Sequence, residues 1–169
     1  MAAGDIKLVY AASSNLTVTA LDGLAASSTW VAGWQSDVID NTSNLYEDFR
    51  VTAKLTAESA GLAAGEIRMY LVGPLDDTTW PDTITGAGQA AKTITDTEIR
   101  DAICKWGAST ATDTTASRVY YLDCESAKAV FRGFLPKKFI IFITQSTGTT
   151  LETTGNQVTV SATYRNVAA

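Results

Sequence analysis

The stretch that decides the fold is Leu45-Tyr-Glu-Asp-Phe-Arg-Val-Thr-Ala-Lys-Leu-Thr-Ala57. Apart from Glu47, its odd positions are apolar, and its even positions are mostly polar. An alternation with period two is typical of a β-strand that packs one face on a core and turns the other to solvent. The sequence therefore predicts a long, half-buried strand here.

Three further segments also indicate strands. Glu66–Val72 alternates in the same way, and the short link at 58–65 predicts that it forms a hairpin with the first strand. Lys138–Thr144 is apolar on both faces, which is typical of a central strand covered on both sides or of a strand at a subunit contact. The Thr- and Gly-rich segment Gln145–Asn156 and the alternation of 158–165 predict a second, wide hairpin.

The rest of the chain completes a β-rich pattern. Threonine, valine and isoleucine are frequent, and their stiff β-branched side chains suit a pleated surface. A short helix is expected within Asp96–Trp106, while Ser126–Phe131 fits either a helical turn or a strand. Residues 73–95 are expected to form a long loop, and long loops in compact domains often have a function. Further strands are expected at Ile6–Tyr10, Leu16–Ala20, Thr29–Ile39 and Arg118–Cys124.

These elements together predict the fold class. About eight strands separated by turn signals predict an all-β chain, a two-layer antiparallel β-sandwich, jelly-roll-like, with at most one or two short helices. Residues 1–169 are expected to form a single β-sandwich domain. Within it, residues 1–10 are expected to be either an extended N-terminal arm that pairs with a neighbour's sheet edge or the first strand of the chain's own sheet.

The charge pattern excludes several classes of partner. The net charge is −5, and Lys and Arg are scattered along the chain. Nucleic-acid binders group these residues to neutralise phosphates, so binding to DNA or RNA is not expected. No polybasic face and no run of roughly 20 apolar residues is present, so no membrane partner is expected either. The first residues lack the features of an export signal, which predicts synthesis in a cytoplasm.

The residues that usually carry catalysis are missing from the sequence. The chain contains no histidine, which excludes Ser-His-Asp and Cys-His catalysis and removes the commonest metal ligand. Cys104 and Cys124 form no CxxC motif, and the expectation in a cytoplasm is two buried thiols. No glycine-rich phosphate loop is present. We therefore expect a protein that is not an enzyme and that binds no cofactor or metal.

Two groups of residues keep a binding role open. Asp76, Asp77 and Asp82 surround Trp80, and such a loop is able to hold calcium or grip a sugar. The alternative, which we favour, is a solvated loop whose aspartates cap turns. Trp30 and Trp34 are expected to share one face of a strand, where a place in the core or at a subunit contact is favoured over a sugar platform.

Three stretches, from the start, the middle and the end of the chain, resemble small structural proteins of tailed phages that decorate, or cement, the capsid. They are Ala3-Gly-Asp-Ile-Lys-Leu-Val-Tyr10, Ile67-Arg-Met-Tyr-Leu-Val-Gly-Pro-Leu-Asp-Asp-Thr-Thr-Trp-Pro-Asp82 and Leu135-Pro-Lys-Lys-Phe-Ile-Ile-Phe-Ile-Thr-Gln-Ser-Thr-Gly148. The resemblance covers nearly the whole chain, and its motifs are structural and not catalytic.

The resemblance implies a β-sandwich module that binds in many copies to the outer surface of a capsid. The implied partners are the major capsid protein and other copies of the chain, commonly in a homotrimer, and the implied location is the virion after synthesis in the host cytoplasm. A phage tail or baseplate protein and a carbohydrate-binding module are the alternatives. The residues expected at the contacts are Ile6, Leu8, Tyr10, Trp80, Phe139 and Ile141.

Overall fold

The computed structural model describes residues 5–58 and 63–167, which form two antiparallel sheets and two short helices. One sheet contains β1 (Ile6–Tyr10), β2 (Ser14–Asn15), β5 (Asp48–Thr56), β9 (Val119–Cys124) and β11 (Gln157–Val167). The other contains β3 (Ala32–Gln35), β4 (Ile39–Asp40), β6 (Gly65–Val72), β7 (Ala90–Thr93), β8 (Lys105–Thr112) and β10 (Lys138–Gln145). The helices are α1 (Thr97–Ile103) and α2 (Ala127–Val130).

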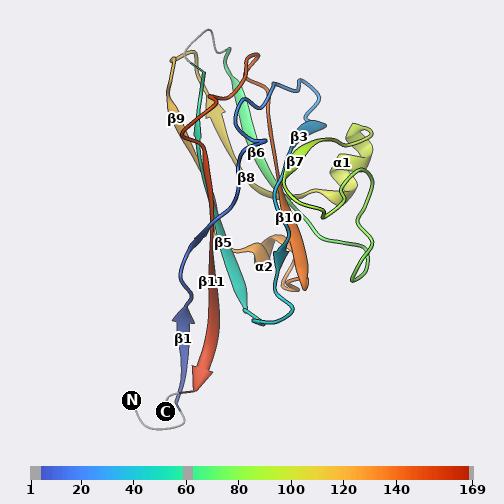
Figure 1. Cartoon of the computed structure of the whole chain (residues 1–169), viewed down its shortest axis with the longest axis vertical. Coiled ribbons are helices and arrows are strands. Elements are labelled where there is room, and N and C mark those ends of the chain that lie inside the picture. Colours follow the sequence, from blue (N-terminus) through green and yellow to red (C-terminus); the bar gives the residue numbers. More distant parts are fainter. Residues whose placement is uncertain (1–4, 59–62, 168–169) are drawn as a thin grey trace.

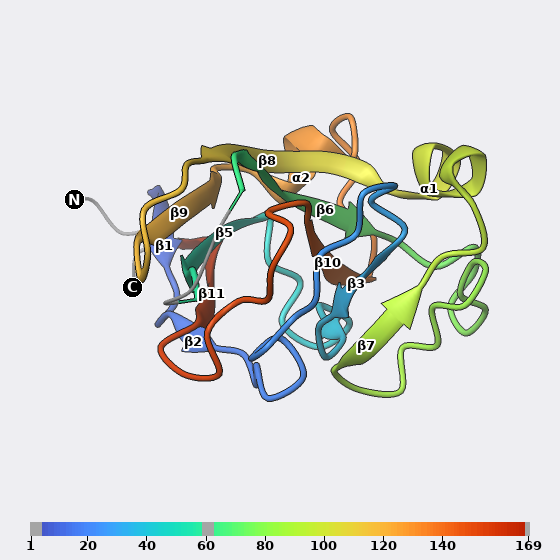
Figure 2. The ribbon, with the colours of Figure 1, turned by 90° about the horizontal axis from the view of Figure 1, so that it is seen from above.

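The strand order is that of a jelly roll. Along the first sheet the strands follow one another as β1-β11-β5-β9, and along the second as β7-β3-β10-β6-β8. The chain crosses repeatedly from one sheet to the other, so that each sheet mixes strands from early and late in the sequence (Figures 1 and 2). The predicted two-layer antiparallel β-sandwich with two short helices is confirmed.

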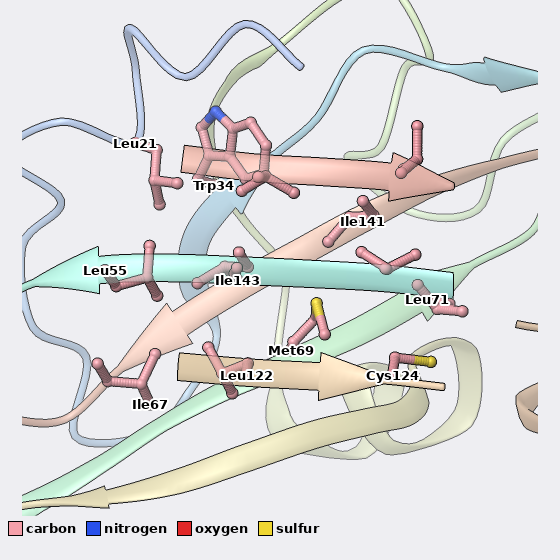
Figure 3. Close-up of a cluster of buried hydrophobic side chains, with 14 of the residues drawn as sticks. Leu21, Trp34, Leu55, Ile67, Met69, Leu71, Leu122, Cys124, Ile141 and Ile143 are labelled. Carbon is pink, nitrogen blue, oxygen red and sulfur yellow. The ribbon is translucent and has the colours of Figure 1, made fainter. Parts of the chain in front are cut away.

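The main core lies between the two sheets. Leu55 of β5 is completely buried, as are Met69 of β6 and Ile141 of β10, and these side chains meet in the space between the layers (Figure 3). The alternation predicted for the deciding stretch is confirmed from Phe49 onward. The stretch does not begin as a strand, because β5 starts only at Asp48.

Both predicted hairpins are wrong. β5 pairs with β11 and β9, whereas β6 pairs with β10 and β8, so the two alternating segments lie in different sheets. β10 and β11 are likewise divided between the sheets. An alternating pattern fixes which face of a strand is buried but not which strand is its neighbour. Part of the predicted 58–65 link, residues 59–62, lies outside the described residues.

A second core covers the outer face of the larger sheet. Ile140 and Phe142 of β10 point away from the main core and pack with Ile84, Ile94 and Cys104, which lie in the segment after β6. This second layer explains why β10 is apolar on both faces, as predicted for a central strand covered on both sides. The long loop expected at 73–95 contains β7, which the sequence analysis missed.

The smaller elements agree in part with the predictions. The helix expected within Asp96–Trp106 is α1, and the Asp96 side chain caps it by accepting a hydrogen bond from the backbone of Ile99. The segment that fitted either a helix or a strand contains the helix α2. The strand expected at Leu16–Ala20 is absent, since this described segment forms no strand. None of the helices in the described part of the chain is long and apolar enough to cross a membrane.

Candidate interaction surface

A two-stranded ribbon extends from one end of the sandwich. β1 runs antiparallel to the last part of β11, with a register from Tyr10 opposite Thr163 to Ile6 opposite Val167. The pairing of β5 with β11 stops at Thr163, so beyond this residue β1 and β11 continue as a pair. Figure 1 shows these strands projecting past the rest of the fold. We call Ile6–Tyr10 together with 163–167 the ribbon.

The outer face of the ribbon carries exposed apolar side chains. Ile6, Leu8 and Tyr10 are 67%, 53% and 75% exposed, and Val167 is 60% exposed. Directly paired residues and every second residue of a strand share a face, so these four side chains lie on the same side. The charged side chain of Arg165, opposite Leu8, lies on this face as well. Exposed apolar patches are typical of interaction surfaces, so this face is a candidate for one. Three of the four were predicted as contact residues.

Aromatic packing fixes the base of the ribbon. On the inner face, the ring of Tyr164 lies 5.8 Å from that of Tyr46, which in turn packs edge-on against Phe49 at 5.5 Å. On the outer face, Arg165, which lies opposite Leu8, donates a hydrogen bond from Nε to Glu47 at 3.1 Å. Phe49 belongs to the main core, so the ribbon is a direct continuation of it. The ribbon is therefore held in a defined direction.

The ribbon also has an open edge. The Ala11 amide donates to the carbonyl of Ala162 at 2.9 Å, and backbone groups in an antiparallel pair point alternately toward and away from the partner. The backbone groups of Ile6, Leu8 and Tyr10 therefore point away from β11. No described strand pairs with this side of β1. The opposite edge of the sheet, β9, lies beside β8 of the other sheet.

Phe139 and Ile141, which were predicted at the contacts, are core residues instead. Both side chains are completely buried, and β10 lies between β6 on one side and β3 and β4 on the other. The Phe139 ring packs edge-on against Phe49 at 5.4 Å and Phe131 at 5.9 Å. These two residues are unavailable to a partner of the folded chain, and their prediction as contact residues is corrected here.

Trp80 lies on the second core, half-buried. Its ring covers Gly86, where a Cβ atom would lie 2.2 Å from the indole nitrogen, and Gly86 has a φ of +62°. Of the neighbouring acids, Asp77 forms an ion pair with Lys137 at 3.0 Å, whereas Asp76 and Asp82 accept hydrogen bonds from threonines of their own segment. Asp76 accepts hydrogen bonds from the backbone of Thr78 and Thr79, which lower the pKa of Asp76 to about 2. The favoured interpretation of aspartates that cap turns therefore fits, and the described residues contain no cluster of three metal-ligating side chains.

The tryptophans do not form the shared strand face that was expected. Trp34 is completely buried on β3, and its indole nitrogen donates to the side chain of Gln89 at 3.0 Å. Trp30 lies before β3 in a turn, with a φ of +63°. The guanidinium carbon of Arg68 instead lies over the Trp30 ring, 3.8 Å from its centroid. The same carbon lies 5.4 Å from the centroid of the Trp106 ring. The arginine thus covers one face of the Trp30 ring.

The sequence analysis missed an apolar groove beside the second core. It is an open depression of about 370 Å³, and its exposed large apolar side chains are Leu75 and Phe134. Two prolines, Pro74 and Pro136, help to line it. The sequence signal for this groove is Phe134, which follows a glycine in Arg132-Gly-Phe134. Connecting segments run over the surface, so an aromatic side chain in one of them is expected to be exposed.

Comparison with known proteins adds no relative to this description. No family model, no curated protein and no solved structure matches the chain. The geometry of the ribbon and of the sheets is therefore what supports a function.

Proposed function

We propose that this protein is a structural component of a tailed-phage virion that binds the outer surface of the assembled capsid and stabilises it. Its proposed role is structural and not catalytic. The proposed partners are the major capsid protein and, on the assembled shell, further copies of the chain grouped in threes around the symmetry axes of the shell. The observation that carries the proposal is the ribbon, which holds Ile6, Leu8, Tyr10 and Val167 in solvent on a rigid base.

The exposed ribbon favours an assembly role on energetic grounds. A two-stranded ribbon in water is marginally stable, and burial of apolar surface contributes about 25 cal/mol per Å². A partner that covers the outer face would therefore stabilise the ribbon while gaining affinity itself. Many such contacts on one shell add through multivalency, even when each is weak.

The fold and the resemblance point in the same direction. Jelly rolls are common in viral capsid proteins, although lectins share them. The early stretch that carries the resemblance to capsid decoration proteins includes β1, the exposed strand of the ribbon. A sugar-binding role has weaker support, because Arg68 stacks on Trp30 and Trp80 packs on its own loop.

Cosedimentation with the phage's empty, expanded capsids tests the proposal. The intact chain is expected to bind to saturation at a copy number that fits the shell symmetry. Val167→Asp is expected to weaken binding on the order of tenfold or more, because a charge at the tip must be desolvated on contact. Leu75→Asp is the matched control at a similarly exposed site on another surface and should bind normally.

A deletion gives the stronger form of the same test. Removal of residues 2–7 is expected to abolish capsid binding and to leave folding intact, because Ile6 and Lys7 are exposed and lie outside the core. Residues 1–4 of this segment lie outside the described residues. Retained binding would overturn the role of the ribbon, and binding to tail tubes in place of capsids would favour a tail component.

A further inference from the structure

We propose that β1 is a self-complementary strand that pairs antiparallel with β1 of a second copy across a twofold axis at Leu8. The pairing would join two copies of the smaller sheet edge to edge. It rests on the strand geometry alone and holds whether or not the protein binds a capsid. Three features of β1 support it: its free backbone groups, the symmetry of its side chains and the absence of a described neighbour on this edge.

The backbone groups of β1 are correctly placed for such a pair. The hydrogen bond from Ala11 to Ala162 fixes the phase of the strand, so that the groups of Ile6, Leu8 and Tyr10 face outward. With Leu8 opposite Leu8 of the second copy, Ile6 falls opposite Tyr10. Every outward-facing residue then meets another outward-facing residue, and each such pair exchanges both of its hydrogen bonds.

The side chains of β1 are also compatible with a twofold axis at Leu8. On the outer face, Leu8 meets its own copy on the axis, and the aromatic ring of Tyr10 meets the β-branched Ile6 on either side. Aromatic and β-branched side chains directly opposite each other stabilise antiparallel strands. On the inner face, Lys7 falls opposite Val9 and not opposite a second lysine. No like charges therefore oppose each other within β1.

The pairing would place the exposed apolar side chains of both ribbons on one face, with Arg165 of each copy on the far side of Leu8 from the axis. A contact in which the same surface serves both partners is isologous, and it closes after two copies. Edge strands with unpaired backbone groups and apolar side chains are strong templates for strand addition. The single charged side chain of β1, Lys7, lies on the opposite face and does not block the approach.

Sedimentation equilibrium of the full chain over a wide concentration range tests this pairing without capsids. The average mass is expected to rise from 17.9 kDa toward twice that value and no further. Leu8→Lys, which brings two ammonium groups together on the axis, should raise the dissociation constant on the order of tenfold or more. Leu75→Lys changes an exposed leucine elsewhere and should leave the dimer unchanged.

Cross-linking provides an independent position-specific test. Leu8→Cys places one thiol of each copy on the axis, where hydrogen-bonded strand partners lie about 5.5 Å apart between Cα atoms, within the range of a disulfide. Cys104 and Cys124 are buried, so the new thiol is the exposed one. Oxidation should give a covalent dimer with Leu8→Cys but not with Leu75→Cys. A monomer at all concentrations, a trimer, or a dimer insensitive to Leu8→Lys would each overturn the pairing.

Discussion

At the scale of single residues, position within a strand decides the environment of otherwise similar side chains. Tyr120 is buried on β9 while its neighbour Tyr121 is exposed on the other face. Phe139 is completely buried, whereas Phe134, in the turn before β10, is 78% exposed. Composition alone does not separate such pairs, because the same side chain serves the core in one place and a surface groove in another.

The two phenylalanines give a direct stability prediction. Phe139→Ala is expected to lower the free energy of unfolding by about 3–5 kcal/mol, because it opens a cavity between two packed sheets. Phe134→Ala should change it by less than about 0.5 kcal/mol, because the ring is already in solvent. Urea denaturation of both variants measures the difference. Equal effects would contradict the assignment of Phe139 to the core.

Asp76 gives a prediction about pH. Backbone donors at Thr78 and Thr79 lower its pKa from 3.8 to about 2, so the ionised form is the one that the folded loop favours. The stabilisation is therefore present above about pH 4 and is lost as the pH falls toward 2. A carboxyl NMR titration should show the Asp76 midpoint near the lower value. A midpoint close to 3.8 would mean that the turn is not formed in solution.

At the scale of elements, the sequence located strands better than it paired them. Both β5 and β6 alternate because both face the main core, but they face it from opposite sheets. Short links between alternating segments are typical of hairpins, and in a jelly roll such a link instead crosses between layers. β8 escaped detection because its sequence, Lys105-Trp-Gly-Ala-Ser-Thr-Ala-Thr112, lacks regular alternation.

The residues predicted at the contacts are exposed on β1 but buried on β10. The exposed side chains of β1 were found because an early, short, apolar strand suggested an arm. β10 was ambiguous, since a strand that is apolar on both faces fits a buried centre as well as a contact. The outer face of β10 is buried because the second core covers it. That core includes Ile84 and Ile94, which lie far from β10 in the sequence. Such long-range packing is not visible in local sequence patterns.

Close approach of β3 to β10 gives a prediction for one element. A Cβ atom on Gly33 would lie 2.4 Å from the carbonyl oxygen of Ile143 and 2.7 Å from the Phe142 ring. Gly33→Ala is therefore expected to destabilise the fold by about 1–3 kcal/mol through overpacking. Gly73→Ala, where the nearest atoms lie 3.5 Å away, is the matched control and should be nearly neutral. Thermal unfolding of both variants compares them, and equal melting temperatures would contradict the close approach.

At the scale of the whole molecule, the packed cores and the exposed ribbon are different parts of the fold. The main core and the second core bury nearly all of β10, and no ribbon residue belongs to either core. The ribbon continues the smaller sheet into solvent, where it offers an apolar face and an open edge (Figure 1). In the proposed function the face contacts the shell. The edge, if paired across twofold axes, would link copies bound at neighbouring threefold sites.

The measurement that tests the central claim most directly is the thermal disruption of empty, expanded capsids with and without the protein. A ligand that binds only the assembled shell stabilises it by mass action. The account therefore predicts a disruption temperature that rises with added protein until the binding sites are full, and no rise with the variant that lacks residues 2–7. An unchanged disruption temperature at saturating protein would contradict the proposal that this protein cements a capsid.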